Sequence, residues 1–489
     1  MSDATSITPH EREQQQTDRN RQLVAQLFEQ QKTIAQLQRI IHELRAEIER
    51  LKSTLASARK TSATSSKPPS SDIVKRKPSA TSTSPRKIGG QPGHPMHERT
   101  PFKPEEINGG VFVHTLSCCP ICHGPVSLSP TSQVVVQQMD LAPLPVRIEE
   151  HRAGFYWCPN CVKYHAAELP PQIDKGRLCG PYLTTLIAYL KGACHASFST
   201  VRRFLRDVAG IRISRGHLAH LITKVSTMLD GPYDELLQLL PIQRHVNVDE
   251  TGHKENGRRP WTWCFRAELF VLFKIESSRG SKVLMDVLGK EFDGLVGCDY
   301  FSAYRKYMRV CGVKIQFCLA HLIRDVKHLL ELPSPKTRTY GEKLLSELRT
   351  LFQVIHQRKT LSATMFQRHL KQARERILSA AKTAVPEAKE AQNMARRFEL
   401  HGAAYFQFIT TPGMEPTNNL AEQAIRFVVI DRVITQGTRG EKGRRWCERI
   451  WSTLATCTLQ GVSAFDYLHK AVSNSLTNEL PPGLLPCST

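Results

Sequence analysis

The stretch that decides the fold begins with RHVNVDETG at residues 244–252. This run alternates polar and apolar residues as a strand does, and we expect the strand to end at Asp249. Two further strands follow the turn GRRP, because WTWCFRAEL and FVLFKIE are rich in aromatic and β-branched residues. The run SKVLMDVLGKEF then has the spacing of an amphipathic helix, and GLVGCD that of a buried strand ending at Asp299.

Three antiparallel strands, a crossover helix and a fourth strand beside the first form the core of the ribonuclease-H-like fold. We therefore predict a multidomain α/β protein with such a catalytic core at residues 241–450. In this arrangement Asp249 and Asp299 stand side by side. Two adjacent carboxylates repel each other unless a cation lies between them, and Mg²⁺ or Mn²⁺ prefers such oxygen ligands.

A third carboxylate is expected from the run TPGMEPTNNLAEQAIRFVVI at residues 411–430. Thr417 or Asn418 can cap a helix that begins there, and Glu422 lies in its first turn. Four apolar residues would seat this helix against the sheet: Leu420, Ile425, Val428 and Val429. Together Asp249, Asp299 and Glu422 are the candidate catalytic residues and the candidate ligands of Mg²⁺, which can promote phosphoryl transfer.

The segment between Asp299 and Glu422 is longer than a bare core requires, and much of it is charged helix. We predict a helical insertion at about residues 322–405. The run CLAH, with Cys318 and His321, precedes this insertion. It supplies two residues of a zinc site, or it supports the active site, or His321 is a satisfied core histidine.

The composition indicates a polyanionic partner. The chain has 489 residues, with 67 Lys and Arg against 45 Asp and Glu, so its formal net charge is +22. Such an excess is most often met by nucleic acid, although a chain can also be basic without such a partner. No apolar run is long enough to span a membrane, and the first 50 residues lack the apolar region of a secretory signal. We expect a cytoplasmic, nucleoid-associated protein.

The N-terminal residues have a heptad pattern. Residues 11–58 place mostly Ile at one core position and Leu at the other, which favours a parallel two-stranded coiled coil, the alternative being one amphipathic helix packed on the body. Residues 59–110 are rich in Ser, Thr, Pro, Gly and Lys, and we predict a disordered basic linker. That linker can follow a phosphate backbone or serve only as a tether.

Two CxxC pairs lie in residues 111–166: Cys119 with Cys122, and Cys158 with Cys161. Each pair presents two thiolates to one tetrahedral ion, so we predict a zinc-binding domain with structural Zn²⁺. Cys118 and His123 are neighbours that could replace a ligand of the first pair. A redox pair or unrelated thiols are the alternatives.

Residues 175–240 are expected to be helical. The pattern of helix, AGIRISRG and helix resembles a helix-turn-helix with several arginines near the turn, while the alternative is a small helical bundle. A C-terminal helical segment is expected at 451–489. Five arginines follow Glu422 and either hold phosphates or form a solvated basic face: Arg426, Arg432, Arg439, Arg444 and Arg445.

Several strings together resemble the transposases of the IS-sixty-six family of bacterial insertion sequences, which are DDE enzymes. Besides the N-terminal coil and the cysteine pairs, they are KPPSSD, GGQPGHP, VDETG, CDYFSAY, CLAH, PTNNLAEQAIR and GTRGEKGRRWCERIWSTLATCTLQGVSAFDYL. The resemblance implies that Asp249, Asp299 and Glu422 are the DDE triad and that Mg²⁺ is used to cut and transfer strands at the element's own ends. Tyr300 and Gln423 depart from the family's usual residues, and neither departure removes a carboxylate.

The resemblance also defines the partners to expect. They are double-stranded DNA at the element ends and at the target, a second copy of the chain through the coil, no membrane, and accessory transposition proteins as an open alternative. A non-catalytic dimeric DNA-binding regulator derived from a transposase is the competing function, and a structure-selective nuclease of the same fold is the third.

Overall fold

The computed structural model describes residues 9–58, short pieces between 103 and 166, and the continuous stretch 178–486. The part before residue 178 contains α1 (Pro9–Ala58), the 3-10 turn η2 (Pro104–Glu106), and the strands β1 (Phe155–Cys158) and β2 (Lys163–Ala166). The strands of the continuous stretch are β3 (His245–Gly252), β4 (Trp261–Arg266), β5 (Val271–Glu276), β6 (Leu295–Cys298) and β7 (Lys314–Phe317).

Helices make up most of the continuous stretch. They are α2 (Pro181–Gly192), α3 (Phe198–Ala209), α4 (Arg215–Met228), α5 (Asp230–Leu239), α6 (Ser281–Leu288), α7 (Ser302–Cys311), α8 (Leu319–Leu330), α9 (Pro335–His356), α10 (Ala363–Lys382), α11 (Lys389–His401), α12 (Asn419–Thr435), α13 (Glu441–Gln460) and α14 (Ala464–Leu476). The 3-10 turns are η3 (Leu240–Ile242), η4 (Gln357–Lys359), η5 (Gly402–Tyr405) and η6 (Gln407–Ile409).

A five-stranded mixed sheet lies at the centre of this part of the chain. Its order is β5-β4-β3-β6-β7, in which β3 is antiparallel to β4 and parallel to β6. The helix α6 makes the crossover between β5 and β6, as predicted. The mixed α/β class is thus confirmed, and the sheet is consistent with a ribonuclease-H-like core. The edge strand β7 was not predicted, because four residues are too short to give a periodic signal.

The prediction that the first strand ends at Asp249 was wrong. β3 continues to Gly252, because residues 250–252 still pair with β4, where Gly252 lies opposite Trp261. On its other side, β3 pairs with β6 only as far as Asn247. Asp249 therefore lies two residues after the last residue that pairs with β6. At this position β3 still pairs with β4. β6 ends at Cys298, one residue before the predicted end, so Asp299 directly follows the strand.

The edge strand β5 is covered by α13 through an unusual set of hydrogen bonds. The backbone N–H groups of Val271, Phe273 and Ile275 donate to side chains of α13. Their acceptors are Thr456 Oγ1, Ser452 Oγ and Glu448 Oε1, at 3.1, 2.9 and 2.7 Å. Four residues of helix and two of strand advance by nearly the same length, roughly 6 Å, so the two series stay in register. The otherwise open edge is thereby closed to another strand.

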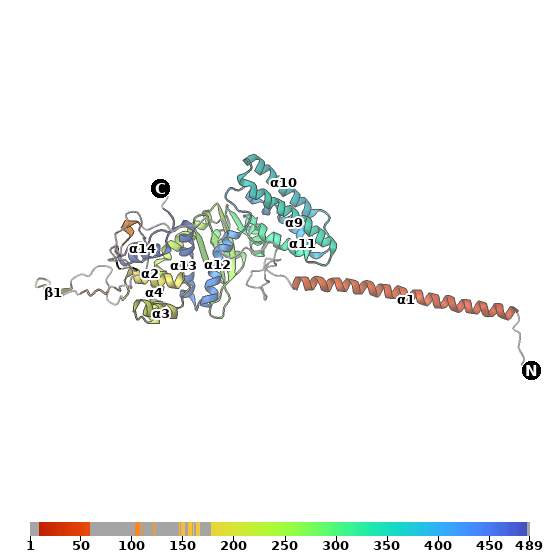
Figure 1. Ribbon diagram of the computed structural model, residues 1–489, viewed down its shortest axis with the longest axis horizontal. Coiled ribbons are helices and arrows are strands. Elements are labelled where there is room, and N and C mark those ends of the chain that lie inside the picture. Colours follow the sequence, from red (N-terminus) through yellow and green to blue (C-terminus); the bar gives the residue numbers. More distant parts are fainter. Residues whose placement is uncertain are drawn as a thin grey trace, which may run out of the picture.

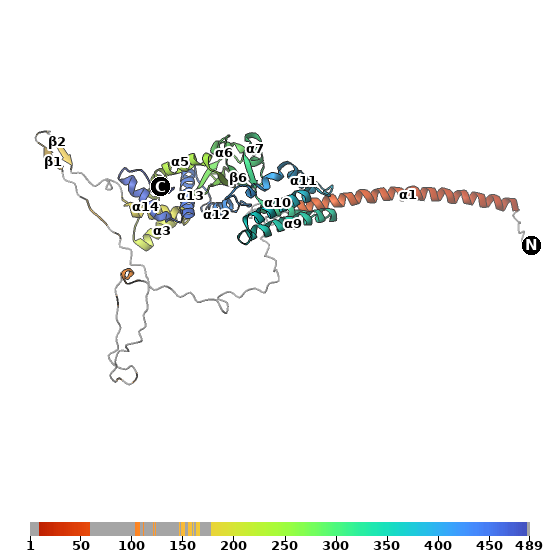
Figure 2. The same cartoon turned by 90° about the horizontal axis from the view of Figure 1, so that it is seen from above.

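The helices on either side of the core belong to distant parts of the sequence. α2 packs on α14, α4 packs on α13, and these helices share one apolar core with β4, β5 and α12. The segments expected at 175–240 and 451–489 therefore meet in space, and the boundary expected at residue 450 falls inside α13. Figures 1 and 2 show α3 and α14 at one end of the body and α9, α10 and α11 at the other.

The helices after β7 form an arm with its own apolar seam. α9 buries Leu344, Leu348 and Leu351, one helical turn apart, and α10 packs against it with Leu370 and Ile377. This arm joins the main core through α8, whose Leu322, Val326 and Leu329 are buried in the apolar core that the arm shares with the sheet. α8 begins at Leu319, so Cys318 and His321 lie at the junction of sheet and arm.

The predicted coil and the predicted zinc domain are only partly within the described residues. α1 is one continuous helix, and its apolar residues are exposed, from 44% at Ile40 to 67% at Phe28. Of the four zinc-ligand candidates, Cys119, Cys122 and Cys161 lie outside the described residues, as does Cys118, and only the backbone of Cys158 is described, at the end of β1. Among the described residues no helix is long and apolar enough to cross a membrane.

Candidate active site

The sheet register brings the two predicted aspartates level with each other. Asn247 on β3 pairs with Gly297 on β6. Asp249 and Asp299 each come two residues later, and residues two apart in a strand face the same side. Gly297 is needed here, because a Cβ at that position would come within 2.4 Å of the Asn247 Nδ2 atom. The Asn247 side chain lies across Gly297 and reaches the loop before α12.

The start of α12 is fastened to this same face of the sheet by Asn418. Its Nδ2 donates to the backbone oxygen of Val248 at 2.8 Å, and its Oδ1 accepts from Asn247 Nδ2 at 2.9 Å. Of the two predicted cap residues, Asn418 occupies the N-cap position of α12, but its side chain bonds to β3 and not to the helix. Within the helix Ala421, Ile425 and Val428 form the buried stripe.

This attachment directs Glu422 toward the aspartates. Glu422 lies in the first turn of α12, and its backbone N–H donates to the Asn418 oxygen at 3.2 Å. Burial raises the pKa of Asp249 well above its usual range, and the negative charges of Glu250, Asp299 and Glu422 raise it further. The charges of Asp299 and Glu422 therefore both act on Asp249. Among the described residues, the donor atoms that lie within 4.8 Å of one another are those of Cys318, His321 and Glu422, and Asp249 and Asp299 do not belong to that group.

Asp299 has more counter-charge around it than Asp249. Burial raises the pKa of Asp299, while a hydrogen bond from the Phe301 N–H to its Oδ1 at 2.8 Å lowers it. The guanidinium groups of Arg279 and Arg397 also favour its charged form. These groups do not offset burial, and the pKa stays raised.

A fourth carboxylate, Glu250, was missed in the sequence. It points to the opposite face of β3, with its side chain only 1% exposed, and is paired with Arg279 at 2.8 Å. The Tyr304 hydroxyl donates to its other oxygen. Burial, and then the charge of Asp299, raise the pKa of Glu250 to about 7. A charged residue in a buried strand requires a partner, which is the signal that could have revealed it.

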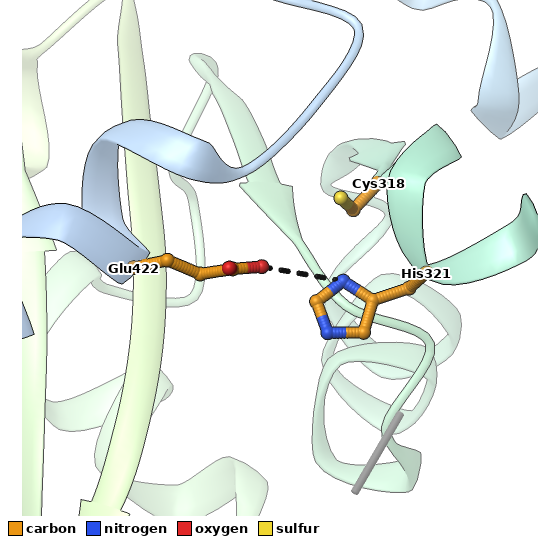
Figure 3. A group of neighbouring side chains, drawn as sticks. All are labelled: Cys318, His321 and Glu422. Carbon is orange, nitrogen blue, oxygen red and sulfur yellow. Dashed lines mark ion pairs between the residues drawn. The ribbon is translucent and has the colours of Figure 1, made fainter. Parts of the chain in front are cut away.

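Cys318 and His321 face Glu422 from the start of α8. The His321 Nδ1 atom lies 3.5 Å from Glu422 Oε1, and Arg324 Nη2 lies 3.7 Å from the same oxygen. Figure 3 shows the imidazole and the carboxylate pointing toward each other, with Cys318 beside the ring. Burial, and then the charge of Arg324, lower the pKa of His321 to about 4, so its ring is neutral at pH 7.

The three predicted carboxylates have the chemistry that suits a divalent cation. Asp249, Asp299 and Glu422 offer oxygen donors whose charges act on Asp249, and Glu422 Oε1 is buried without a hydrogen-bond partner. Such hard oxygen ligands suit Mg²⁺ or Mn²⁺, and a cation among them would remove the repulsion. These three residues are therefore the ones that could hold it.

The five arginines after Glu422 do not form a single basic face. Arg432 donates to Thr251 Oγ1 in β3 at 3.1 Å, and Arg444 lies 3.7 Å from Glu255 Oε1 in the loop after β3. Arg445 pairs with Glu441 within α13 at 3.9 Å. Arg426 and Arg439 are exposed.

Taken together, the mixed sheet and the carboxylates at the β3 and β6 positions are consistent with a ribonuclease-H-like core that carries an acidic site. Comparison with known proteins agrees with this class. The profile described as Transposase IS66 family matches residues 176–445, more than half of the chain. The chain therefore belongs to the IS66 family of transposases.

Two curated proteins of Sinorhizobium fredii are distantly similar. The uncharacterized protein y4jD is 23% identical over 406 residues, which cover 75% of this chain and 77% of that protein. The uncharacterized protein y4qI is 23% identical over 322 residues, covering 59% of this chain and 58% of its own length. Neither name adds an activity, so the family is the functional information that these comparisons give.

Proposed function

We propose that this chain is a DNA transposase that cuts and transfers the strands at the ends of an insertion sequence, with Asp249, Asp299 and Glu422 as its catalytic triad. The observation that carries the proposal is the pKa of Asp249, which burial raises and which the charges of Glu250, Asp299 and Glu422 raise further, so that the negative charges of both other predicted triad residues act on Asp249. Family membership supports the transposase role.

In the proposed reaction, water attacks a phosphodiester bond at the element end and leaves a free 3′-OH. That hydroxyl then attacks a target phosphodiester in line, and no bond to the protein forms. Mg²⁺ or Mn²⁺, when bound, would stabilise negative charge on the phosphate and hold the reacting oxygens. The chain's own residues position this chemistry: Asn418 fixes the helix that carries Glu422, and Arg279 holds Glu250 away on the far face.

DNA binding is proposed for the helices α3 and α4 and for the predicted zinc domain. Arg202, Arg203, Arg212 and Arg215 are exposed on or beside these two helices, and Gly210 makes the left-handed turn that ends α3. Exposed arginines on a helix-turn-helix arrangement are suited to phosphate contacts. The hairpin β1–β2 flanks the second CxxC pair, as strands do in a zinc ribbon.

A parallel homodimer through α1 is the proposed assembly. The Ile and Leu residues at the predicted heptad core positions are about half exposed, for example Leu23, Leu37 and Ile48 at 50%, 53% and 49%. An apolar seam on a single 50-residue helix is stabilised when a second helix covers it. Accessory transposition proteins would be further partners of this assembly.

The test is a Mg²⁺-dependent nicking assay on supercoiled DNA that carries the element ends. Asp249→Asn keeps the side-chain volume and removes the charge, so it should abolish nicking while leaving binding to the ends intact. Asp286→Asn is the matched control, since Asp286 is exposed on α6.

Three results would separate the competing functions. Nicking that survives in Asp249→Asn would refute the triad assignment. Binding to the ends without nicking by the wild-type chain would favour the non-catalytic regulator. Nicked products that never join to target DNA would favour a structure-selective nuclease.

A further inference from the structure

Cys318, His321 and Glu422 form a compact group of three different donor types. Cys318 is the N-cap of α8, and His321 lies three residues later, so both side chains lie on the same side of the first turn. Glu422 approaches from α12, and the sulfur, nitrogen and oxygen atoms lie within 4.8 Å of one another (Figure 3). In sequence Glu422 is about 100 residues away, which is why only two members of the group could be recognised there.

Two polar atoms of this group, one on His321 and one on Glu422, have no hydrogen-bond partner. His321 is 8% exposed, and both its Nδ1 and the Glu422 Oε1 are buried without a hydrogen bond. Their separation of 3.5 Å is longer than an N–H···O bond prefers. It is close to the separation of roughly 3.4 Å expected between nitrogen and oxygen ligands of one tetrahedral Zn²⁺ ion.

A hydrogen bond fixes the Cys318 sulfur close to the His321 nitrogen and the Glu422 oxygen. The backbone N–H of Asn418 donates to Cys318 Sγ at 3.2 Å, so the residue that fastens α12 also fixes the thiol. The backbone of α8 is tied to the same loop, since Leu319 N–H donates to the Pro416 oxygen at 3.0 Å. The two helices that supply the three donors are therefore locked together, and a cation would find its ligands already positioned.

We propose that Cys318, His321 and Glu422 form a second cation site, selective for Zn²⁺, that shares Glu422 with the Asp249 and Asp299 group. Thiolate and imidazole donors favour Zn²⁺ over Mg²⁺, and three protein ligands leave a fourth position for water. Zinc in this site withdraws the Glu422 carboxylate from the Mg²⁺ ligands and inhibits strand cleavage. This inhibitory consequence rests on the proposed function, whereas zinc binding does not.

The direct test is metal binding by the full-length chain after removal of metal. Co²⁺ serves as a spectroscopic probe, because a cobalt thiolate bond gives an absorption band, and Zn²⁺ titration gives the number of ions per chain. Cys318→Ser should remove part of the cobalt thiolate absorption and lower the zinc count by one. Cys457→Ser is the matched control, because Cys457 is also buried but lies outside the group.

Two further variants keep the result interpretable. The double variant Cys119→Ser/Cys122→Ser should retain the band that depends on Cys318, which separates this site from the predicted zinc ribbon. His321→Gln should also lower the zinc count by one, and it covers the case in which Cys318→Ser fails to fold, as judged by circular dichroism. An equal zinc count in the wild type and in a folded ligand variant would overturn the proposal.

The inhibition is tested by adding Zn²⁺ to the nicking assay at fixed Mg²⁺ and comparing each variant with its own zinc-free rate. We expect inhibition of the wild type and of Cys457→Ser, and weaker inhibition of Cys318→Ser. Zinc binding without any nicking activity would count against the proposed function and not against the site. Nicking that zinc inhibits equally in the wild type and in Cys318→Ser would overturn the shared-ligand proposal.

Discussion

Asp249 and Glu250 are neighbours on β3, yet their carboxylates lie on opposite faces of the sheet and have different surroundings. Glu250 is buried with Arg279 and Tyr304, and its oxygens are satisfied by protein groups. Asp249 faces Asp299 and Glu422, so its charge is opposed by other carboxylates. The surroundings of Glu250 are those of a structural ion pair. The surroundings of Asp249 are those expected of the proposed cation site.

The same contrast appears in the residues that support each face. Arg279 stacks on Phe301 with its Cζ 3.8 Å from the ring centre and closes the Glu250 side. On the Asp249 side the hydrogen bonds that fasten α12 to β3 come from neutral amides, those of Asn247 and Asn418. Arg279 therefore pairs directly with Glu250, whereas the charged form of Asp249 would be favoured by a metal ion.

The largest expected effect is on the Asp249 face. Glu422→Gln should lower the nicking rate about 10³-fold, since losing a metal ligand removes about 4 kcal/mol of transition-state stabilisation. The free energy of unfolding should change little, because Glu422 Oε1 has no hydrogen bond to lose. Glu399→Gln, exposed on α11, is the control for the assay. A rate within a few-fold of wild type would remove Glu422 from the triad.

On the Glu250 face, we expect a substitution to lower the free energy of unfolding. Glu250→Ala leaves the Arg279 charge and the buried Tyr304 hydroxyl without their partner, which costs about 3 kcal/mol in the free energy of unfolding. Glu276→Ala removes a more exposed ion pair with Lys274, and we expect a loss below about 1 kcal/mol. Urea denaturation measures both. Equal losses would mean that the two pairs do not differ as their burial suggests.

Asn418→Ala should affect both properties, because this residue joins α12 to β3. It leaves the Asn247 amide and the Val248 carbonyl unpaired, at a cost of about 2 kcal/mol. The nicking rate should also fall about 10-fold, since Glu422 loses its support. Asn419→Ala, exposed at the next position, is the matched control for both measurements. If Asn418→Ala changed stability alone, α12 would hold Glu422 without this link.

Local patterns were enough to predict the strands β3 to β6, the crossover helix and the positions of Asp249 and Asp299 in the order of elements. Local patterns failed where the important contact joins residues that are far apart in the sequence. The role of Asn418 depends on an amide 171 positions earlier, and Glu422 meets His321 across a fold that local spacing does not reveal.

Glu250 shows a different limit of sequence reasoning. Strand alternation places its side chain opposite Asp249, but alternation does not say that the opposite face is also buried. That burial follows from α6 and α7, whose side chains join the apolar core on that side. The edge of β5 is similar, because no local signal in α13 tells that Ser452 and Thr456 will bond to a strand.

The smallest effect is a pH dependence that distinguishes the two neighbouring carboxylates. The pKa of Glu250 is raised from 4.5 to about 7, so the folded chain keeps this proton more firmly than the unfolded chain. The resulting stabilisation is fully present below about pH 4.5 and is lost as the pH rises through about 7, by roughly 3 kcal/mol. In metal-free buffer, the difference in unfolding free energy between wild type and Glu250→Gln should follow this loss. Glu276→Gln should show no such difference, and a pH-independent difference for Glu250→Gln would mean that Arg279 keeps Glu250 charged throughout.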